Sequence, residues 1–207
     1  MSKLDLDGCG DLNAKQFNML VRKIGGFSRK PILDVSDGND DWVVQLSQRG
    51  GTINGIADRS GEASSEIVAV GSPAASICYS TLSMHRVLIR NNSAFQTPDV
   101  TPESTIALAN LLSCLRPGGK LIIPIKDVDR CQCLWTRRLE GFPGTLQQRQ
   151  IKTGLLDYLS FGFLFSGIHS LSVLEFTIGR KPLSRLQWHR FAREAVMNRS
   201  AGNSAAA

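Results

Sequence analysis

Short β-rich runs alternate with helical stretches from Pro31 onward, and this alternation constrains the fold more than any other feature of the sequence. Strands that are separated by crossover helices pair side by side in parallel sheets, so the pattern is typical of an α/β fold. The first four strands are predicted at Ile32–Val35, Thr52–Ala57, Arg86–Arg90 and Lys120–Ile125.

The helix ahead of the fourth strand has the clearest boundaries. Thr101 can cap its first turn, Pro102 suits the first helical position, and Pro117-Gly118-Gly119 ends the run. These signals predict a helix over Pro102–Leu115. A further helix is expected at Asp41–Gln48, after the first strand.

The last third of the sequence predicts a helix followed by two strands. The helix is expected around Leu146–Leu159, and the two β-rich runs at about Phe163–Ser170 and Val173–Gly179. The two runs are close enough in sequence to pair as an antiparallel hairpin. The expected topology is therefore a parallel sheet that ends in a hairpin.

Composition indicates one globular domain. The chain has 207 residues, of which 42% are hydrophobic and 20% are charged, so disorder is not expected. No apolar run approaches the roughly 20 residues that cross a bilayer, and the first residues carry acids where a signal peptide would be basic. We therefore expect a soluble, cytoplasmic protein that does not enter a membrane.

The cysteines indicate neither a disulfide framework nor a metal centre. Their number is five, which is odd, so a reducing compartment is expected. Cys131 and Cys133 form a CxC pair, but no second pair and no nearby histidine completes a zinc site. No bound metal is predicted.

Positive charge is concentrated at the carboxyl-terminal end. The formal net charge is +6, and the last 28 residues contribute most of it through Arg180, Lys181, Arg185, Arg190, Arg193 and Arg199 against Glu194 alone. Such a segment can attract nucleic acid. It can equally be a solvated helix whose apolar side faces the protein, with Leu183, Leu186, Phe191 and Val196 turned inward. Nucleic acid is not specifically indicated, and the last eight residues, SAGNSAAA, are expected to be disordered.

The amino-terminal stretch Asp5–Gln16 has the spacing of a calcium-binding loop. Its ligands are unsuitable at two positions, because Cys9 offers a soft thiol and Gln16 an amide where calcium prefers hard oxygen and a closing carboxylate. We instead expect Asp11 or Asn13 to cap a helix. Whether this loop binds calcium is left open by the sequence.

The stretch Ile32–Glu62 carries the most informative chemistry. A predicted strand contains Asp34, a tight turn contains Gly38, an apolar helix follows, and the second strand ends at Asp58, 20 residues beyond the glycine. In Rossmann-like folds the turn backbone approaches a cofactor, and an acid after the second strand accepts hydrogen bonds from ribose hydroxyls. The glycine turn and the acid after the second strand have a suitable separation in this sequence.

These residues resemble the class I S-adenosylmethionine-dependent methyltransferases, whose first motif has the form hhDhGxGxG, with h apolar. The chain matches it with Ile32–Val35 followed by Ser36–Asp40. Leu115–Leu121 is similar to the family's LxPGGxL turn, and Gly179–Pro182 ends the last strand as in many members. The resemblance covers about Pro31–Pro182, and the order of the motifs is more specific than any one of them.

The resemblance implies a Rossmann-like, mostly parallel seven-stranded sheet with helices on both faces and a carboxyl-terminal antiparallel β-hairpin. It implies S-adenosylmethionine as the cofactor. The residues that it places at the cofactor are Asp34, Ser36, Gly38, Asp58 and Asn91. Asn91 begins a segment that in the family often carries substrate-facing residues.

The first motif departs from the family pattern at two of its three glycines. Ser36 and Asp40 replace them, and only Gly38 remains. Glycine at such positions lets the backbone come close to the cofactor, whereas side chains add bulk and, at Asp40, negative charge. The departure predicts weakened cofactor binding or none.

Three functions stay open at this stage. The first is methyl transfer to a small-molecule acceptor, the second is a catalytically inactive methyltransferase-like binding protein, and the third is a nucleic-acid-directed enzyme that uses the basic tail. No catalytic residue is assigned, because His85, His169 and His189 are dispersed. We divide the chain into an amino-terminal helical extension (1–30), the methyltransferase-like domain (31–182), and a basic helix with a disordered tail (183–207). The oligomeric state is not indicated.

Overall fold

The computed structural model describes Gln16, Leu20 and residues 32–36, 53–57, 67–69, 82–90, 93–152 and 170–205. Every statement below about structure concerns these residues. Of the predicted amino-terminal helix they include Gln16 and Leu20, both helical, and Leu20 is fully buried. The rest of the proposed calcium loop lies outside the described residues.

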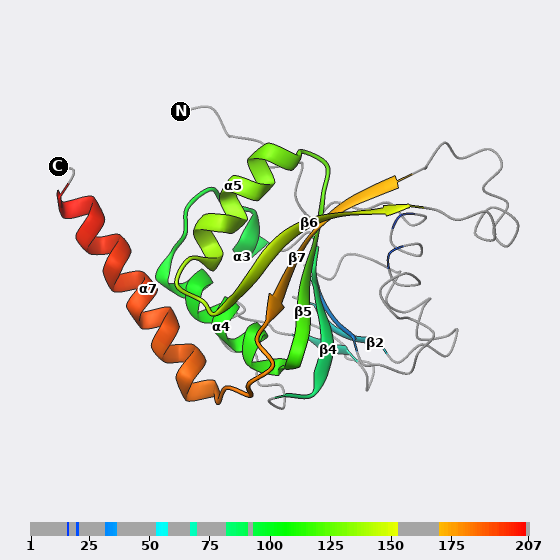
Figure 1. Ribbon diagram of the computed structural model, residues 1–207, viewed down its shortest axis with the longest axis horizontal. Helices are drawn as coiled ribbons and strands as arrows, with labels where there is room; N and C mark the ends of the chain where they lie inside the picture. The colour runs from blue at the N-terminus through cyan, green and yellow to red at the C-terminus, as the bar shows by residue number, and fades with distance from the viewer. Residues whose placement is uncertain are drawn as a thin grey trace, which may run out of the picture.

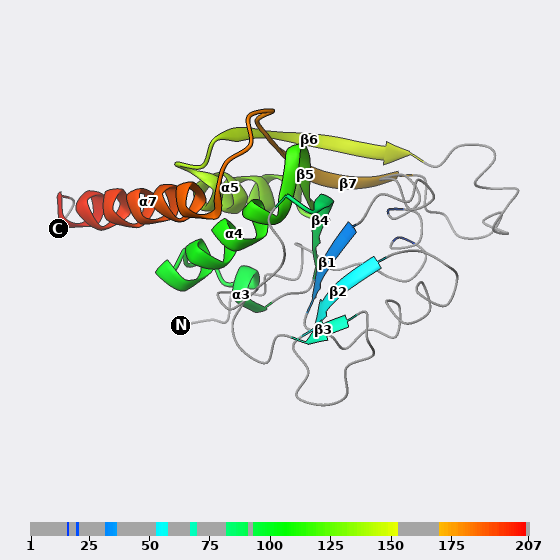
Figure 2. The same cartoon turned by 90° about the horizontal axis from the view of Figure 1, so that it is seen from below.

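The described strands form one seven-stranded sheet, with the order β3-β2-β1-β4-β5-β7-β6 (Figures 1 and 2). Strands β1 to β5 pair in parallel, and β7 runs antiparallel to both of its neighbours. The strands are β1 (Ile32–Ser36), β2 (Ile53–Ala57), β3 (Ile67–Ala69), β4 (Met84–Ile89), β5 (Leu115–Ile125), β6 (Gly144–Lys152) and β7 (Ser170–Ile178).

The labelled helices cover one face of this sheet (Figure 1). They are α3 (Ser93–Gln96), α4 (Pro102–Cys114), α5 (Val128–Leu139) and α7 (Arg185–Ala205). A continuous apolar core lies between them and the sheet, and it includes Leu33, Val87, Leu121, Leu111, Trp135 and Trp188. The predicted helix at Asp41–Gln48 lies outside the described residues, and helices on the second face remain a prediction.

The start of α4 is confirmed. The Thr101 side chain accepts a hydrogen bond from the Ser104 amide at 3.1 Å, and Pro102 occupies the first turn. The helix stops after Cys114, where the backbone becomes extended at Leu115.

The Pro-Gly-Gly segment differs from its prediction. It lies inside β5 as a bulge, because the β4–β5 register moves from Met84↔Leu115 to Arg86↔Lys120. Gly118 has a φ of +72°, a conformation that favours glycine. Here the motif interrupts pairing within the strand and does not precede the strand.

The predicted helix at Leu146–Leu159 is wrong over its first part, where the chain forms β6. This strand pairs with β7 from Gly144↔Ile178 to Lys152↔Ser170, so the terminal hairpin exists but its first strand is β6 and not Phe163–Ser170. Leu, Gln and Arg are good helix formers, but intrinsic helix propensity amounts to less than about 1 kcal/mol per residue, and pairing with β7 outweighs it. The start of β6 also requires glycine, since a Cβ at Gly144 would lie 2.3 Å from an atom of the Phe176 ring.

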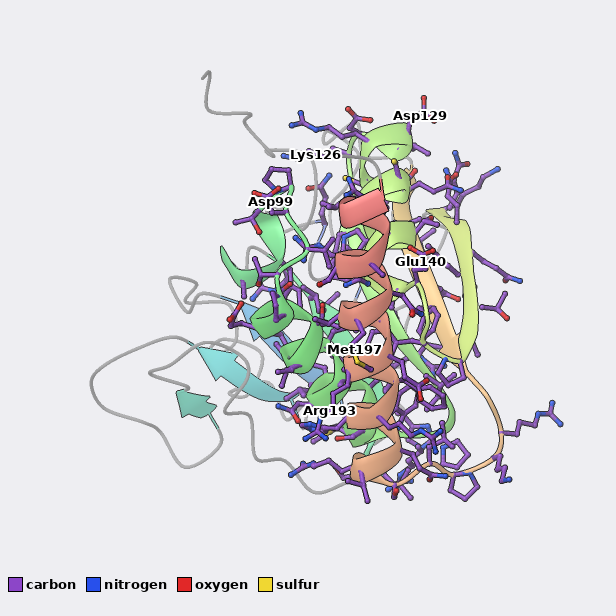
Figure 3. The ribbon with its side chains drawn as sticks, turned by 90° about the vertical axis from the view of Figure 1, so that its left-hand side faces the viewer. Asp99, Lys126, Asp129, Glu140, Arg193 and Met197 are labelled. Carbon is purple, nitrogen blue, oxygen red and sulfur yellow. The ribbon has the colours of Figure 1, made fainter. Side chains whose placement is uncertain are left out.

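Helix α7 corrects two expectations about the carboxyl-terminal segment. It continues to Ala205, so the predicted disorder does not begin at Ser200. Of its predicted inward residues, Leu183 and Phe191 do pack against the core, but Leu186 is 79% exposed. Trp188, Ala192 and Ala195 of the helix are buried. Arg193 and Met197 lie on its outer side (Figure 3).

The sequence also led to expectations about disulfides, metal binding and membrane helices. Cys131 is disulfide-bonded, although the odd cysteine count indicated no disulfide framework, whereas Cys114 and Cys133 are free. Among the described residues no group of His, Cys, Asp or Glu could hold a metal ion. No described helix is both long and apolar enough to cross a membrane.

Two basic side chains form ion pairs with one buried carboxylate on the sheet. The Glu175 side chain of β7 is 8% exposed and pairs with Lys120 Nζ at 2.6 Å and Arg149 Nη1 at 3.1 Å. Burial by itself raises the pKa of Glu175, but the hydrogen bonds and charges of Lys120 and Arg149 outweigh burial and leave that pKa below its usual value. The carboxylate therefore joins β5, β6 and β7.

We expect Glu175→Gln to lower the free energy of unfolding by about 1–2 kcal/mol at pH 7, because it removes the negative charge that Lys120 and Arg149 face. The native pKa lies below the unfolded value of about 4.3, so the contribution is complete above that pH. It disappears as the pH falls through the native pKa. Urea unfolding at several pH values should show the two proteins converging in acid, and an equal difference at all pH values would contradict this.

We expect Trp188→Ala to destabilise the protein by about 3 kcal/mol, because the ring is 1% exposed and packs against Phe142 and Phe191. Leu186→Ala, on the same helix, is the matched control and should change stability by no more than about 0.5 kcal/mol. Urea unfolding measures both. Equal effects would mean that α7 docks through a different face.

Candidate functional site

The order of the strands reverses between β1 and β4. From β1 the sheet continues through β2 and β3 on one side, and from β4 through β5 and β7 on the other. In open α/β sheets, ligands bind outside the carboxyl ends of the strands at such a reversal, because crossovers leave there in opposite directions and open a crevice. The carboxyl ends of β1 and β4 are therefore the candidate site.

The β1–β4 pairing continues to the very end of both strands. Val35 lies opposite Ile89, and the Arg90 amide donates a hydrogen bond to the Val35 carbonyl at 3.0 Å. The ends of β1 and β2 also coincide, since Ser36 lies opposite Ala57. Three parallel strands thus finish together at one edge.

The structure brings two of the five predicted cofactor residues onto the central strand. Asp34 lies in register with Gly55 and Leu88, and Ser36 is the last residue of β1. The other three, Gly38, Asp58 and Asn91, lie outside the described residues. Asp58 and Asn91 directly follow Ala57 and Arg90, which lie at the same edge as Ser36.

Arg90 is a feature of this edge that the sequence interpretation did not single out. It was read as the last residue of a strand, yet the structure leaves it 1% exposed immediately after β4. A buried guanidinium keeps its charge, so it favours an anionic group nearby. The signal in the sequence was a cation at the end of an apolar run, VLIR.

The segment that follows the candidate site is held by a second buried arginine. Arg138 of α5 is 1% exposed and donates hydrogen bonds to the Thr97 and Asp99 carbonyls and to Ser104 Oγ. Its guanidinium lies 5.9 Å from the ring centroids of both Phe95 and Trp135. Residues 97–99 connect α3 to α4, so Arg138 fixes the chain where it leaves the carboxyl edge.

Burial is the main reason why the pKa of Arg138 falls to about 10, and the charges of Arg199 and Arg137 lower it further. The group stays protonated at neutral pH. Sequence analysis missed it, although its spacing of seven, four and three residues from Cys131, Leu134 and Trp135 places it on the buried side of a helix.

The two described histidines are not at the carboxyl edge. His189 on α7 makes a 2.8 Å hydrogen bond with Asn110 Oδ1, and burial, with the charges of Arg185 and Arg193, lowers its pKa. His85 lies near the amino end of β4, where its Nε2 is 3.2 Å from Arg116 Nη1. His169 lies outside the described residues. We therefore assign no catalytic role to His85 or His189.

Comparison with known proteins adds information about the fold. No family model matches the sequence, and no curated protein matches it. Among solved structures, the chain is similar to the 1,6-didemethyltoxoflavin-N1-methyltransferase of Burkholderia thailandensis, which was solved with 1,6-didemethyltoxoflavin and S-adenosylhomocysteine. The TM-score is 0.51 at 14% identity, over 81% of this chain and 80% of the other.

Two further structures have the same level of similarity. StiE O-MT, residues 942–1257, gives a TM-score of 0.52 at 13% identity, over 88% of this chain and 79% of that one. The cyclase SpnF gives 0.50 at 13% identity, over 83% and 86%. At these identities the likeness establishes the architecture and not the activity. The chain has the Rossmann-like fold found in S-adenosylmethionine-dependent methyltransferases.

Proposed function

We propose that this protein is an S-adenosylmethionine-dependent methyltransferase that acts on a small-molecule acceptor. The observation that carries the proposal is the reversal of strand order between β1 and β4, with Asp34 and Ser36 of the divergent first motif on the central strand. A structure of similar fold holds S-adenosylhomocysteine, the product of methyl transfer, which supports the choice of cofactor.

The residues at the carboxyl edge suit different parts of such a cofactor. Asp58, directly after β2, would accept hydrogen bonds from ribose hydroxyls. The backbone of Gly38 would approach the methionine part, next to Asp34 and Ser36. Asn91, which directly follows Arg90, would lie beside the cofactor.

Bound S-adenosylmethionine supplies an activated methyl group. The chain's contribution is to hold an acceptor in line with that group and to exclude water, and proximity provides much of the rate. Arg138 supports this by fixing residues 97–99 behind the carboxyl end of β4. No catalytic base is proposed, since neither described histidine lies at this edge.

The alternative is a methyltransferase-like protein without methyl transfer. Two observations favour it: Ser36 and Asp40 replace motif glycines, and a protein named as a cyclase has a similar fold. Side chains at those positions would narrow the space for the cofactor. Such a protein would use the same edge for binding alone.

Nucleic-acid binding has less support. Several cations of the basic segment make contacts within the protein: Arg190 with Glu194, Arg185 with Ser113, and Arg199 with Thr105. The contacts of Arg185 and Arg199 attach α7 to α4, and the Arg190–Glu194 pair lies within α7. A cytoplasmic location and the three-part division of the chain remain predictions.

We expect S-adenosylmethionine to bind the full-length protein in calorimetric titration, with an affinity about tenfold weaker in Asp58→Ala, because the ribose hydroxyls lose their acceptor. Glu194→Ala, an exposed acid on α7, is the matched control and should bind normally. Absence of binding at millimolar cofactor would overturn the proposal. An unchanged affinity in Asp58→Ala would place the ribose elsewhere.

We expect Ser36→Gly and Asp40→Gly, singly and together, to increase the affinity for S-adenosylmethionine, since they remove bulk and, at Asp40, charge from the motif turn. The double variant should improve affinity severalfold over the parent in the same titration. A gain in affinity without methylation of any acceptor would favour the inactive alternative. Weaker binding would show that the serine and aspartate themselves contact the cofactor.

A further inference from the structure

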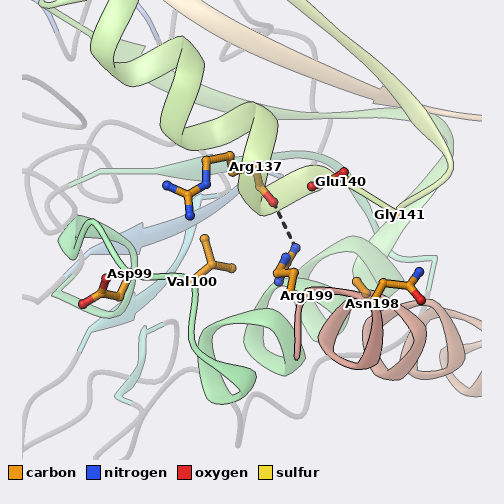
Figure 4. Close-up of a pocket in the computed structure, with 8 residues that line it drawn as sticks. Asp99, Val100, Arg137, Glu140, Gly141, Asn198 and Arg199 are labelled. Atoms are coloured by element: carbon orange, nitrogen blue, oxygen red, sulfur yellow. Dashed lines mark hydrogen bonds between the residues drawn. The ribbon is translucent and has the colours of Figure 1, made fainter. Parts of the chain in front are cut away.

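A pocket of about 470 Å³ opens between α5, α7 and the segment that precedes α4 (Figure 4). This volume is in the range of small-molecule sites. The helices α5 and α7, which supply much of its lining, lie on the helical side of the sheet, away from β1 and β2 (Figure 2). Its lining residues are Asp99, Val100, Arg137, Glu140, Gly141, Ala195, Asn198 and Arg199.

Arg199 is held rigidly in the wall of this pocket. Its Nη1 donates to Thr105 Oγ1 at 3.0 Å and its Nη2 to the Arg137 carbonyl at 2.9 Å, the contact marked in Figure 4. These bonds fasten α7 to α4 and α5 at one point. A ligand that meets a fixed guanidinium pays less ordering entropy on binding than one that meets a mobile side chain.

The opposite wall is also fixed. Arg138 lies behind it and binds the carbonyls of Thr97 and Asp99, so the backbone next to Val100 is held in place. Arg138 makes no ion pair with a described acid, and its buried Nε has no hydrogen-bond partner in the described part of the structure. Its hydrogen bonds go to carbonyl and hydroxyl oxygens, and the carboxylate of Asp99 partly offsets its charge.

The charged residues that line the pocket are balanced, with Arg137 and Arg199 against Asp99 and Glu140. The buried guanidinium of Arg138, which lies behind the wall and does not line the pocket, adds one further positive charge. Burial lowers the pKa of Arg199, Glu140 opposes that shift, and Arg137 adds to it, which shows that the three side chains interact. An anion in the pocket would relieve the repulsion between the arginines.

We propose that this pocket binds a small organic anion that also carries hydroxyl or amino groups. Its carboxylate or phosphoryl group would accept hydrogen bonds from Arg137 and Arg199, as guanidinium groups favour. Asn198 and Asp99 would accept from its hydroxyl or amino groups, and Val100 and Ala195 would contact its carbon skeleton. The site is separate from the carboxyl edge and does not depend on the proposed methyl transfer.

The test is calorimetric titration of the full-length protein, at constant ionic strength, with citrate, with inorganic phosphate and with glycerol. Citrate represents a hydroxylated carboxylate, phosphate the phosphoryl group, and glycerol an uncharged polyol. We expect saturable binding of citrate, of phosphate or of both, and none of glycerol. The anion that binds identifies the chemical group that the arginines recognise.

Three variants locate the binding. Arg137→Gln should weaken it about tenfold, because it removes an exposed guanidinium while its carbonyl still anchors Arg199. Glu140→Gln should strengthen it, because a repelling carboxylate is removed. Arg193→Gln, an exposed arginine on α7 outside the pocket, should leave it unchanged. Thermal unfolding checks that all three fold.

The proposal is overturned if neither anion binds, if glycerol binds as well as citrate, or if Arg137→Gln and Arg193→Gln behave alike. Asp58→Ala gives a further check, since it should not alter anion binding. If it abolishes that binding, the anion occupies the carboxyl edge and not this pocket. Failure of the S-adenosylmethionine titration would leave these results untouched, so the two proposals fail separately.

Discussion

The parallel pairing of β1 with β4 is the constraint on which the rest of the structure depends. It reverses the strand order at the centre of the sheet, and the hydrogen bond from Arg90 to Val35 carries it to the carboxyl edge. The same pairing sets Leu33 opposite Val87, so that both enter the core beneath the helices. The register of β1 with β4 therefore determines both which side chains enter the core and where the candidate site lies.

Buried charges at two places keep the outer elements in position. Glu175 joins β7 to Lys120 and Arg149 of its neighbouring strands, and Arg138 joins α5 to the segment behind β4. Groups of this kind are costly to bury unless they are fully bonded, so each specifies one arrangement of the elements around it. The organic-anion pocket arises next to Arg138, where three arginines come together.

Much of the fold could be predicted from local patterns, and the errors arise where tertiary contacts outweigh them. The start of α4 was readable from Thr101 and Pro102, and the strands at Ile32 and Ile53 from their apolar runs. The helix predicted at Leu146–Leu159 was wrong because β6 lies at the edge of the sheet, where polar residues are exposed and the pattern says little. Leu186 was misplaced because packing of Trp188 sets the rotation of α7.

The sequence by itself determined the order of β1, β2, β4, α4 and β5 and the position of the motif residues along the chain, because caps, glycines and apolar runs act locally. It also supplied Asp34, Ser36, Gly38, Asp58 and Asn91 as a candidate set. Only the tertiary structure decided which strands are neighbours and that arginines from α5 and α7 meet at one pocket. Those contacts join residues far apart in sequence, where no local pattern records the partner.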